Sequence, residues 1–138
     1  MNPTTHHTGL TVSDLDRSIE FYTELLGCTV ESRFSVGGEA LQTAVDTPEV
    51  SGTFAHLRSG QTRIELVEYE PAEEASPPES IPQPGATHLA FAVEDVDAFL
   101  KELPDDIESL SAPQTAESGT RIVFVRDPDG NFVELLEA

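Results

Sequence analysis

Residues 7–16 read His-Thr-Gly-Leu-Thr-Val-Ser-Asp-Leu-Asp, and a similar pattern returns 81 positions later. The second copy is residues 88–97, His-Leu-Ala-Phe-Ala-Val-Glu-Asp-Val-Asp. One histidine, one valine and two aspartates coincide in the two copies. Each copy alternates apolar and small residues and then places aspartates where a helix would begin, which is typical of a strand that runs into a helix. The repeat predicts a chain of two related halves.

The helices are expected directly after the two copies. Ser13 is the expected N-cap of the first helix. Gly27 is expected to end this helix in a left-handed conformation. The second helix is expected to present its apolar face up to Leu103, and Pro104 ends it. The apolar stripes consist of Leu15, Ile19, Tyr22 and Leu26 in the first helix, and Val96, Phe99, Leu100 and Leu103 in the second.

Each half then continues as strands. Asp127-Pro128-Asp129-Gly130 predicts a hairpin turn near the end of the chain, since proline presets φ and glycine accepts a positive φ. Both halves therefore predict one strand, one helix and two or three further strands, which is an α+β fold. The expected strands are Thr29–Val36, Leu41–Asp46, Thr53–Leu57 and Arg63–Tyr69 in the first half, and Glu108–Leu110, Thr120–Arg126 and Asn131–Leu136 in the second.

The segment between the halves, 71–86, contains five prolines and more polar than apolar residues, so we expect a linker. We expect a single domain over 1–138, with modules at 5–70 and 87–138. A module of about 65 residues is marginally stable alone, so the modules should pack together or pair with another chain.

Composition excludes several classes of function. The chain carries 26 acidic and 7 basic residues, for a formal charge of -19, and only one lysine, Lys101. Such a surface repels nucleic acid and anionic lipid. It favours a halophilic protein, since molar salt shortens the Debye length to about 3 Å. The single cysteine, Cys28, excludes an intrachain disulfide and suits a cytoplasmic protein. No signal peptide or membrane-spanning apolar run is expected.

Both halves place the same chemistry at matching positions. Each first strand begins with a histidine, His7 or His88, and each last strand carries a glutamate between aliphatic residues, Glu65 or Glu134. Strand alternation sends the aliphatic neighbours to one face and the glutamate to the other. Two imidazoles and two carboxylates are therefore expected to meet. Mixed nitrogen and oxygen ligation suits Zn, Ni, Co, Mn or Fe better than Ca.

The alternative for each of these residues is structural. A lone strand histidine is more often a hydrogen-bonded polar residue, and a lone alternating glutamate usually faces water. The repetition favours the metal interpretation. His6 is expected on the opposite face from His7 and receives no role, while His56 lacks a counterpart in the second half and is expected to be a polar strand residue. Arg63 and Arg121 are expected to balance nearby acids.

The combined pattern resembles the vicinal-oxygen-chelate superfamily, which includes glyoxalases, bleomycin-resistance proteins and extradiol dioxygenases. The resemblance covers nearly the whole chain outside the linker, and it implies two βαβββ modules that form a cupped mixed sheet, commonly in a homodimer. The matching segments are residues 7–12, 14, 17–22, 26–27, 64–66, 88–93 and 127–135.

The ligand set implies a branch of the superfamily. Extradiol dioxygenases and fosfomycin-modifying transferases match His7, His88 and Glu134, without a ligand at position 65. Glyoxalase I and methylmalonyl-CoA epimerase use a fourth ligand that matches Glu65. The resemblance therefore implies a metal-dependent lyase or isomerase of the lactoylglutathione lyase type. The alternatives are an Fe(II)-dependent dioxygenase, a thiol transferase, or a non-enzymatic ligand-binding protein.

In the lyase and isomerase members the chemistry is proton transfer at an enediolate, next to a carbonyl. By resemblance, Glu134 or Glu65 would be the base, and the substrate a small carbonyl compound or its thiol adduct. Glyoxalase I typically has an arginine where this chain has Thr11, and an asparagine where it has Tyr69. These departures disfavour glutathione as the thiol.

Overall fold

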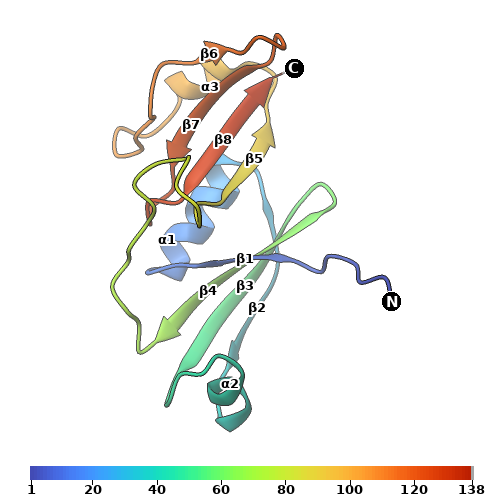
Figure 1. Ribbon diagram of the computed structural model, residues 1–138, viewed down its shortest axis with the longest axis vertical. Helices are drawn as coiled ribbons and strands as arrows, with labels where there is room; N and C mark the ends of the chain where they lie inside the picture. Colours follow the sequence, from blue (N-terminus) through green and yellow to red (C-terminus); the bar gives the residue numbers. More distant parts are fainter. Residues whose placement is uncertain (138) are drawn as a thin grey trace. The chain divides into compact units, whose positions relative to one another are not determined.

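The computed structural model describes residues 1–137 and divides into two compact units, Met1–Ala75 and Ser76–Ala138 (Figure 1). Each unit contains its own four-stranded sheet. Within the described residues, no helix is long and apolar enough to cross a membrane.

The sheet of the N-terminal unit has the strand order β1-β4-β3-β2. Strand β1 (Thr8–Thr11) runs parallel to β4 (Thr62–Glu70). Strand β3 (Ser51–Ser59) pairs antiparallel with both β4 and β2 (Thr29–Val36), and the β2–β3 register shifts between Val30 and Ser32. The sheet is therefore mixed, with its parallel pair at one edge.

The C-terminal unit repeats this arrangement with the strand order β5-β8-β7-β6. Strand β5 (His88–Ala92) is parallel to β8 (Phe132–Glu137), and β8 is antiparallel to β7 (Arg121–Arg126). The short β6 (Gln114–Thr115) completes the sheet beside β7. The expectation of an α+β fold with two repeated modules is confirmed.

A helix follows the first strand in each unit. Helix α1 (Leu15–Glu20) continues as a π-helical segment, η1 (Phe21–Leu25), and helix α3 covers Val96–Lys101. The N-cap of α1 is Asp14 and not the expected Ser13: Asp14 is extended and its Oδ1 accepts a hydrogen bond from the Arg17 amide at 3.1 Å. Asp95 caps α3 in the same way, through the Ala98 amide at 2.9 Å.

Two expected strands are wrong. Residues 41–46 fall largely in a helix, α2 (Glu39–Ala44), which begins after Gly38 at φ +100°. Alanine, leucine and glutamine favour the helix there, and the segment lacks the strict alternation of a strand. Over 108–110 the structure has a single bridge, between Ser109 and Val125, because only one residue pair comes into register.

The aliphatic neighbours of the two conspicuous glutamates form the centre of each core. Ile64 and Leu66 are buried around Glu65, and Val133 and Leu135 are buried around Glu134. Helix α1 contacts β3 and β4, and α3 contacts β7 and β8. The predicted alternation is confirmed: the aliphatic residues line the core, while each glutamate projects from the opposite face of its strand.

Candidate metal centre

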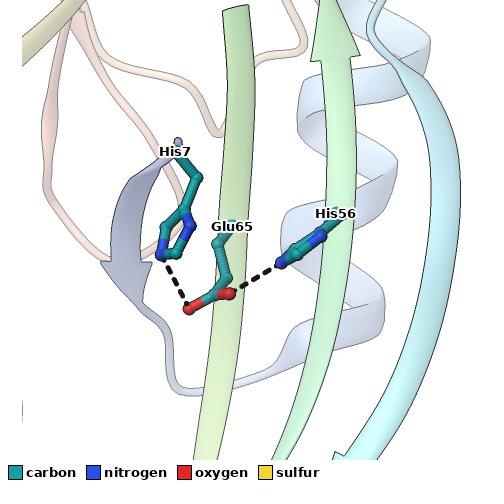
Figure 2. Close-up of side chains that lie close together, drawn as sticks. All are labelled: His7, His56 and Glu65. Carbon is teal, nitrogen blue, oxygen red and sulfur yellow. Dashed lines mark hydrogen bonds and ion pairs between the residues drawn. The ribbon is translucent and has the colours of Figure 1, made fainter. Parts of the chain in front are cut away.

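The N-terminal unit gathers three side chains that could hold a metal ion, His7, His56 and Glu65. His7 and His56 approach the Glu65 carboxylate from either side (Figure 2). His56 Nε2 donates to Glu65 Oε2 at 2.7 Å, and His7 Nε2 lies 3.5 Å from Glu65 Oε1. Since each imidazole faces a different carboxylate oxygen, one glutamate is shared by two histidines.

Strand register explains this convergence. The β3–β4 hairpin turns between Ser59 and Thr62 and places His56 directly opposite Glu65. Parallel pairing of β1 with β4 places Gly9 opposite Glu65, and His7 lies two residues before Gly9. Directly opposed residues of paired strands point to the same side, so His56 lies on the face that carries Glu65. His7 lies just before β1, where its Nε2 comes within 3.5 Å of the same carboxylate.

His6 also belongs to this cluster, contrary to the expectation that alternation would remove it. His6 and His7 precede β1, so strand alternation does not govern them. Their Nδ1 atoms lie 2.8 Å apart, and Arg63 donates to His6 Nε2 at 3.1 Å. A guanidinium only donates, so His6 accepts at Nε2 and donates from Nδ1 to His7 Nδ1, which places the hydrogen of His7 on Nε2 in this arrangement. This contact leaves Nε2 as the ring nitrogen of His7 that faces Glu65.

The C-terminal unit contains the second expected pair. His88 Nε2 lies 3.2 Å from Glu134 Oε1, and the side chains are 39% and 16% exposed. The residue opposite Glu134 on the neighbouring strand is Phe124, the positional counterpart of His56. Its ring meets the His88 ring edge-on with centroids 5.3 Å apart. Glu134 therefore faces one imidazole and one aromatic ring where Glu65 faces two imidazoles.

The expected site residues thus form two pairs, one in each unit. His7 lies beside Glu65, and His88 lies beside Glu134. Convergence of both pairs on one ion stays a prediction. His56 received no role from the sequence, although a signal existed: a two-residue turn after Ser59 places residues 56 and 65 opposite each other.

Nearby arginines are neutralised, as expected. Arg58 donates to both oxygens of Glu31, at 2.8 and 3.1 Å, and Arg63 reaches the same carboxylate at 3.3 Å. The hydrogen bond from Arg58 is the main cause that holds the pKa of Glu31 below its ordinary value. In the other unit, Arg121 is paired with Asp97 at 2.6 and 2.9 Å.

The donor chemistry fits a divalent transition metal. Imidazole nitrogen with carboxylate oxygen suits Zn, Ni, Co, Mn and Fe. The side chains of His56 and Glu65 are each 16% exposed and that of His7 is 34% exposed, so an ion there would be partly shielded yet reachable. The three N-terminal residues each offer a ligand atom, and these atoms lie within 4.8 Å of one another.

Several known proteins are similar to this chain in sequence and in fold. The sequence is 31% identical to a 2-epi-5-epi-valiolone epimerase from Actinomyces sp. over 95% of this chain and 77% of that protein. It is also 31% identical to a probable lactoylglutathione lyase from Vibrio cholerae, over 95% of this chain and 88% of that protein. A glyoxalase family protein from Bacillus cereus superposes with a TM-score of 0.86 at 25% identity, over 96% of this chain and 92% of that chain.

The sequence model of one superfamily matches residues 4–135, which includes both histidine–glutamate pairs. Together with the repeated sheets and the relatives above, this match assigns the chain to a superfamily. The protein belongs to the Glyoxalase/Bleomycin resistance protein/Dioxygenase superfamily.

Proposed function

We propose that the protein is a metal-dependent lyase or isomerase that acts on a small carbonyl compound or its thiol adduct by proton transfer next to the carbonyl. The observation that carries this proposal is the repeated pairing of a histidine Nε2 with a glutamate Oε1, at 3.5 Å in one unit and 3.2 Å in the other. A duplicated pair supplies four ligands, which agrees with the lyase and isomerase ligand set and not with a three-ligand set.

In this proposal His7, Glu65, His88 and Glu134 hold one divalent ion, which is Zn, Ni, Co, Mn or Fe. When bound, the ion would supply Lewis-acid polarisation of a carbonyl oxygen. The protein contributes the orientation of the ligands, as where His56 donates to one oxygen of Glu65 and fixes that carboxylate. Partners of this kind commonly orient metal ligands.

The proton is moved by a glutamate, and the surroundings of the two glutamates favour Glu134. Glu65 Oε2 is engaged by His56 at 2.7 Å, which holds that carboxylate in place. Glu134 has Phe124 at the corresponding position, and an aromatic ring does not compete for its second oxygen as an imidazole does. Glu134 is therefore proposed as the general base that exchanges the proton, with Glu65 mainly a ligand.

The substrate class is supported by two relatives that are named for different activities, an epimerase and a probable lactoylglutathione lyase. Both lie near 31% identity, so neither substrate is assigned to this chain. Thr11 and Tyr69 stand where glyoxalase I typically has groups that serve glutathione. We therefore propose a thiol other than glutathione, or a free carbonyl compound.

We also propose a homodimer, because modules of this size are marginally stable alone and commonly cover apolar sheet surface with another module. Sedimentation in molar salt tests this, and about twice 14.9 kDa is the expected mass. A clean monomer would contradict the dimer without touching the chemistry.

The decisive experiment follows proton exchange in deuterated high-salt buffer. Methylglyoxal with several thiols, and short acyl-CoA epimers, are screened for deuterium incorporated beside the carbonyl. We expect incorporation by the wild type and a loss of about 10²–10⁴ in rate in Glu134→Gln, since general-base catalysis contributes that much. Glu73→Gln, at an exposed position in the proline-rich segment 71–86, is the control and should be unchanged.

The same preparation distinguishes the dioxygenase. Oxygen consumption with a catechol and Fe(II), with full activity retained in Glu65→Gln, would replace the lyase proposal by a three-ligand dioxygenase. Protein that contains no metal when purified without chelator, and that takes none up, would contradict both enzymes and leave a ligand-binding protein.

A further inference from the structure

We infer that His56 is a third metal ligand of the N-terminal unit, so that His7, His56 and Glu65 hold a divalent cation without help from the C-terminal unit. This inference concerns the metal centre of the proposed function. It rests on that function in one respect, since it assumes that the bound ion is the divalent metal proposed there. It adds a residue and assigns the anchoring of the ion to one unit.

The atoms that would bind the ion already face one another. Metal–ligand bonds of about 2.0–2.2 Å place two ligands of one ion roughly 3–4 Å apart. His7 Nε2 and Glu65 Oε1 are 3.5 Å apart, which meets this requirement. His56 Nε2 is on the other oxygen of the same carboxylate at 2.7 Å, where a proton now lies between the two atoms. A cation would replace that proton and the hydrogen on His7 Nε2, both of which would be released to solvent, with a small movement of the side chains.

The imidazole rings of His7 and His56 lie close enough to coordinate one ion. The His7 and His56 centroids are 5.7 Å apart with planes inclined by 34°. Each ring is supported from outside the cluster: His6 contacts His7 through Nδ1, and Phe34 meets the His56 ring edge-on at 5.1 Å. The side chains of His56 and Glu65 are equally shielded, at 16% exposed. Two histidines and one carboxylate on one side of an ion leave its other positions open.

All three ligands come from the N-terminal unit. His56 and Glu65 are opposite each other in the β3–β4 hairpin, and His7 leads into the strand paired with β4. Their spacing therefore depends on strand pairing within the N-terminal unit alone. Such a set can bind an ion before any other part of the chain approaches.

The C-terminal unit provides a comparison within the same molecule. Its residues His88 and Glu134 are paired at 3.2 Å, but the position of His56 is taken by Phe124, which has no ligand atom. Two ligands hold an ion less firmly than three. The N-terminal unit should therefore bind a divalent cation more tightly than the C-terminal unit does.

The experiment measures Co²⁺ binding by the full chain, without substrate. In the Co²⁺-loaded protein every coordinating histidine contributes a strongly shifted imidazole N–H proton signal, and the chain has only four histidines. We expect a signal that disappears in His56→Phe and survives in the double variant His88→Ala/Glu134→Ala. His56→Phe should weaken Co²⁺ binding more than about 100-fold, because removal of a mere supporting partner costs 10–100-fold.

His56→Phe is chosen because phenylalanine is tolerated at the matching position of the other unit, and His56→Gln serves as a second variant. The inference is overturned if no shifted signal belongs to His56, which would leave it as a hydrogen-bonding support of Glu65. It is also overturned if the double variant binds no Co²⁺. In either case the lyase proposal stands as long as the wild-type protein binds Co²⁺ through His7 and His88. The lyase proposal itself fails only if the purified wild-type protein binds no Co²⁺.

Discussion

The two units pair their strands in the same order, yet they differ in how much apolar surface supports the sheet. Among the described residues, twelve buried apolar side chains lie in the N-terminal unit and six in the C-terminal unit. The strands β3 and β4 have nine residues each, whereas their counterparts β7 and β8 have six. The repeated topology therefore rests on two cores of different size.

The two units share the side-chain contacts made by the glutamates of their last strands. Glu65 and Glu134 project toward a histidine, and three residues later Glu68 and Glu137 accept hydrogen bonds from the first amides of α1 and α3, at 2.7 and 3.2 Å. Residues three apart in a strand point to opposite faces. In each unit, one glutamate therefore faces the candidate site while the glutamate three residues later accepts a hydrogen bond from the start of the helix. These two contacts explain why both glutamates recur.

What the units do not share lies around the first glutamate of each pair. His56 beside Glu65 and Phe124 beside Glu134 give one carboxylate a second imidazole and the other an apolar ring. The two units thus share a frame and differ in the residue that lies opposite the glutamate on the neighbouring strand.

The largest stability effects should come from the two cores. Leu66→Ala and Leu135→Ala remove matching, fully buried side chains. Each should lower the free energy of unfolding by about 2–5 kcal/mol, through lost burial and the cavity left behind. Because the C-terminal core is smaller, Leu135→Ala should reduce amide-exchange protection over a larger part of its own unit than Leu66→Ala does in the N-terminal unit. Chemical denaturation combined with amide hydrogen exchange measures both changes.

Thr43→Ala, in the exposed part of α2, is the control and should have little effect. Equal loss of exchange protection across both units in both leucine variants would mean that the units unfold together, and the difference in core size would then have no independent consequence.

Much of the frame could be predicted from the sequence because it depends on local periodicity. The repeat at residues 7 and 88 predicted two related modules, and β2 was predicted with its observed bounds, Thr29–Val36. Alternation around Glu65 and Glu134 predicted which neighbours are buried. These features follow from the spacing of apolar residues along one strand or helix, which a sequence displays directly.

The surroundings of the site were harder to predict because they depend on register between strands. His56 was considered a plain strand residue, since its partnership with Glu65 appears only when β3 is paired with β4. His6 was sent to the wrong face because alternation was extended to residues that precede β1. Helix α2 occupies most of a segment in which the sequence predicts a strand, since six residues are too few for either periodicity to be distinctive.

Salt should stabilise both units, and the C-terminal unit more. The N-terminal unit has thirteen acids against four basic residues and the C-terminal unit thirteen against three, although the latter has the smaller core. Screening shortens the range of repulsion from about 10 Å at 0.1 M to about 3 Å at 1 M salt. The melting temperature should therefore rise between these conditions, by roughly 4 °C for each 1 kcal/mol gained.

Amide exchange at 0.1 M and above 1 M KCl would locate that gain, with β8 expected to gain more protection than β4. A melting temperature that is flat or falls with salt would contradict the proposed halophilic character. A larger gain in β4 would instead reverse the ranking of the two units.

The smallest effect concerns the ion pairs that support each helix. Arg121 donates two hydrogen bonds to Asp97 at 2.6 and 2.9 Å, whereas Arg33 donates one to Asp16 at 2.9 Å with both side chains more exposed. The hydrogen bond from Arg121 is the main cause that lowers the pKa of Asp97 below its ordinary value, and burial of the carboxylate opposes it.

A carboxylate whose pKa is lower in the folded than in the unfolded chain stabilises the fold above the unfolded value, about 3.9. That stabilisation is lost as the pH falls through the folded pKa of Asp97. Arg121→Ala should therefore raise the pKa of Asp97, seen by carboxyl NMR titration. It should also flatten the acid dependence of unfolding below about pH 4, with the matched Arg33→Ala changing that dependence less. If the pKa of Asp97 is unchanged in Arg121→Ala, Arg121 does not lower that pKa. The ion pairs beside α1 and α3 would then not differ in their effect on acid stability.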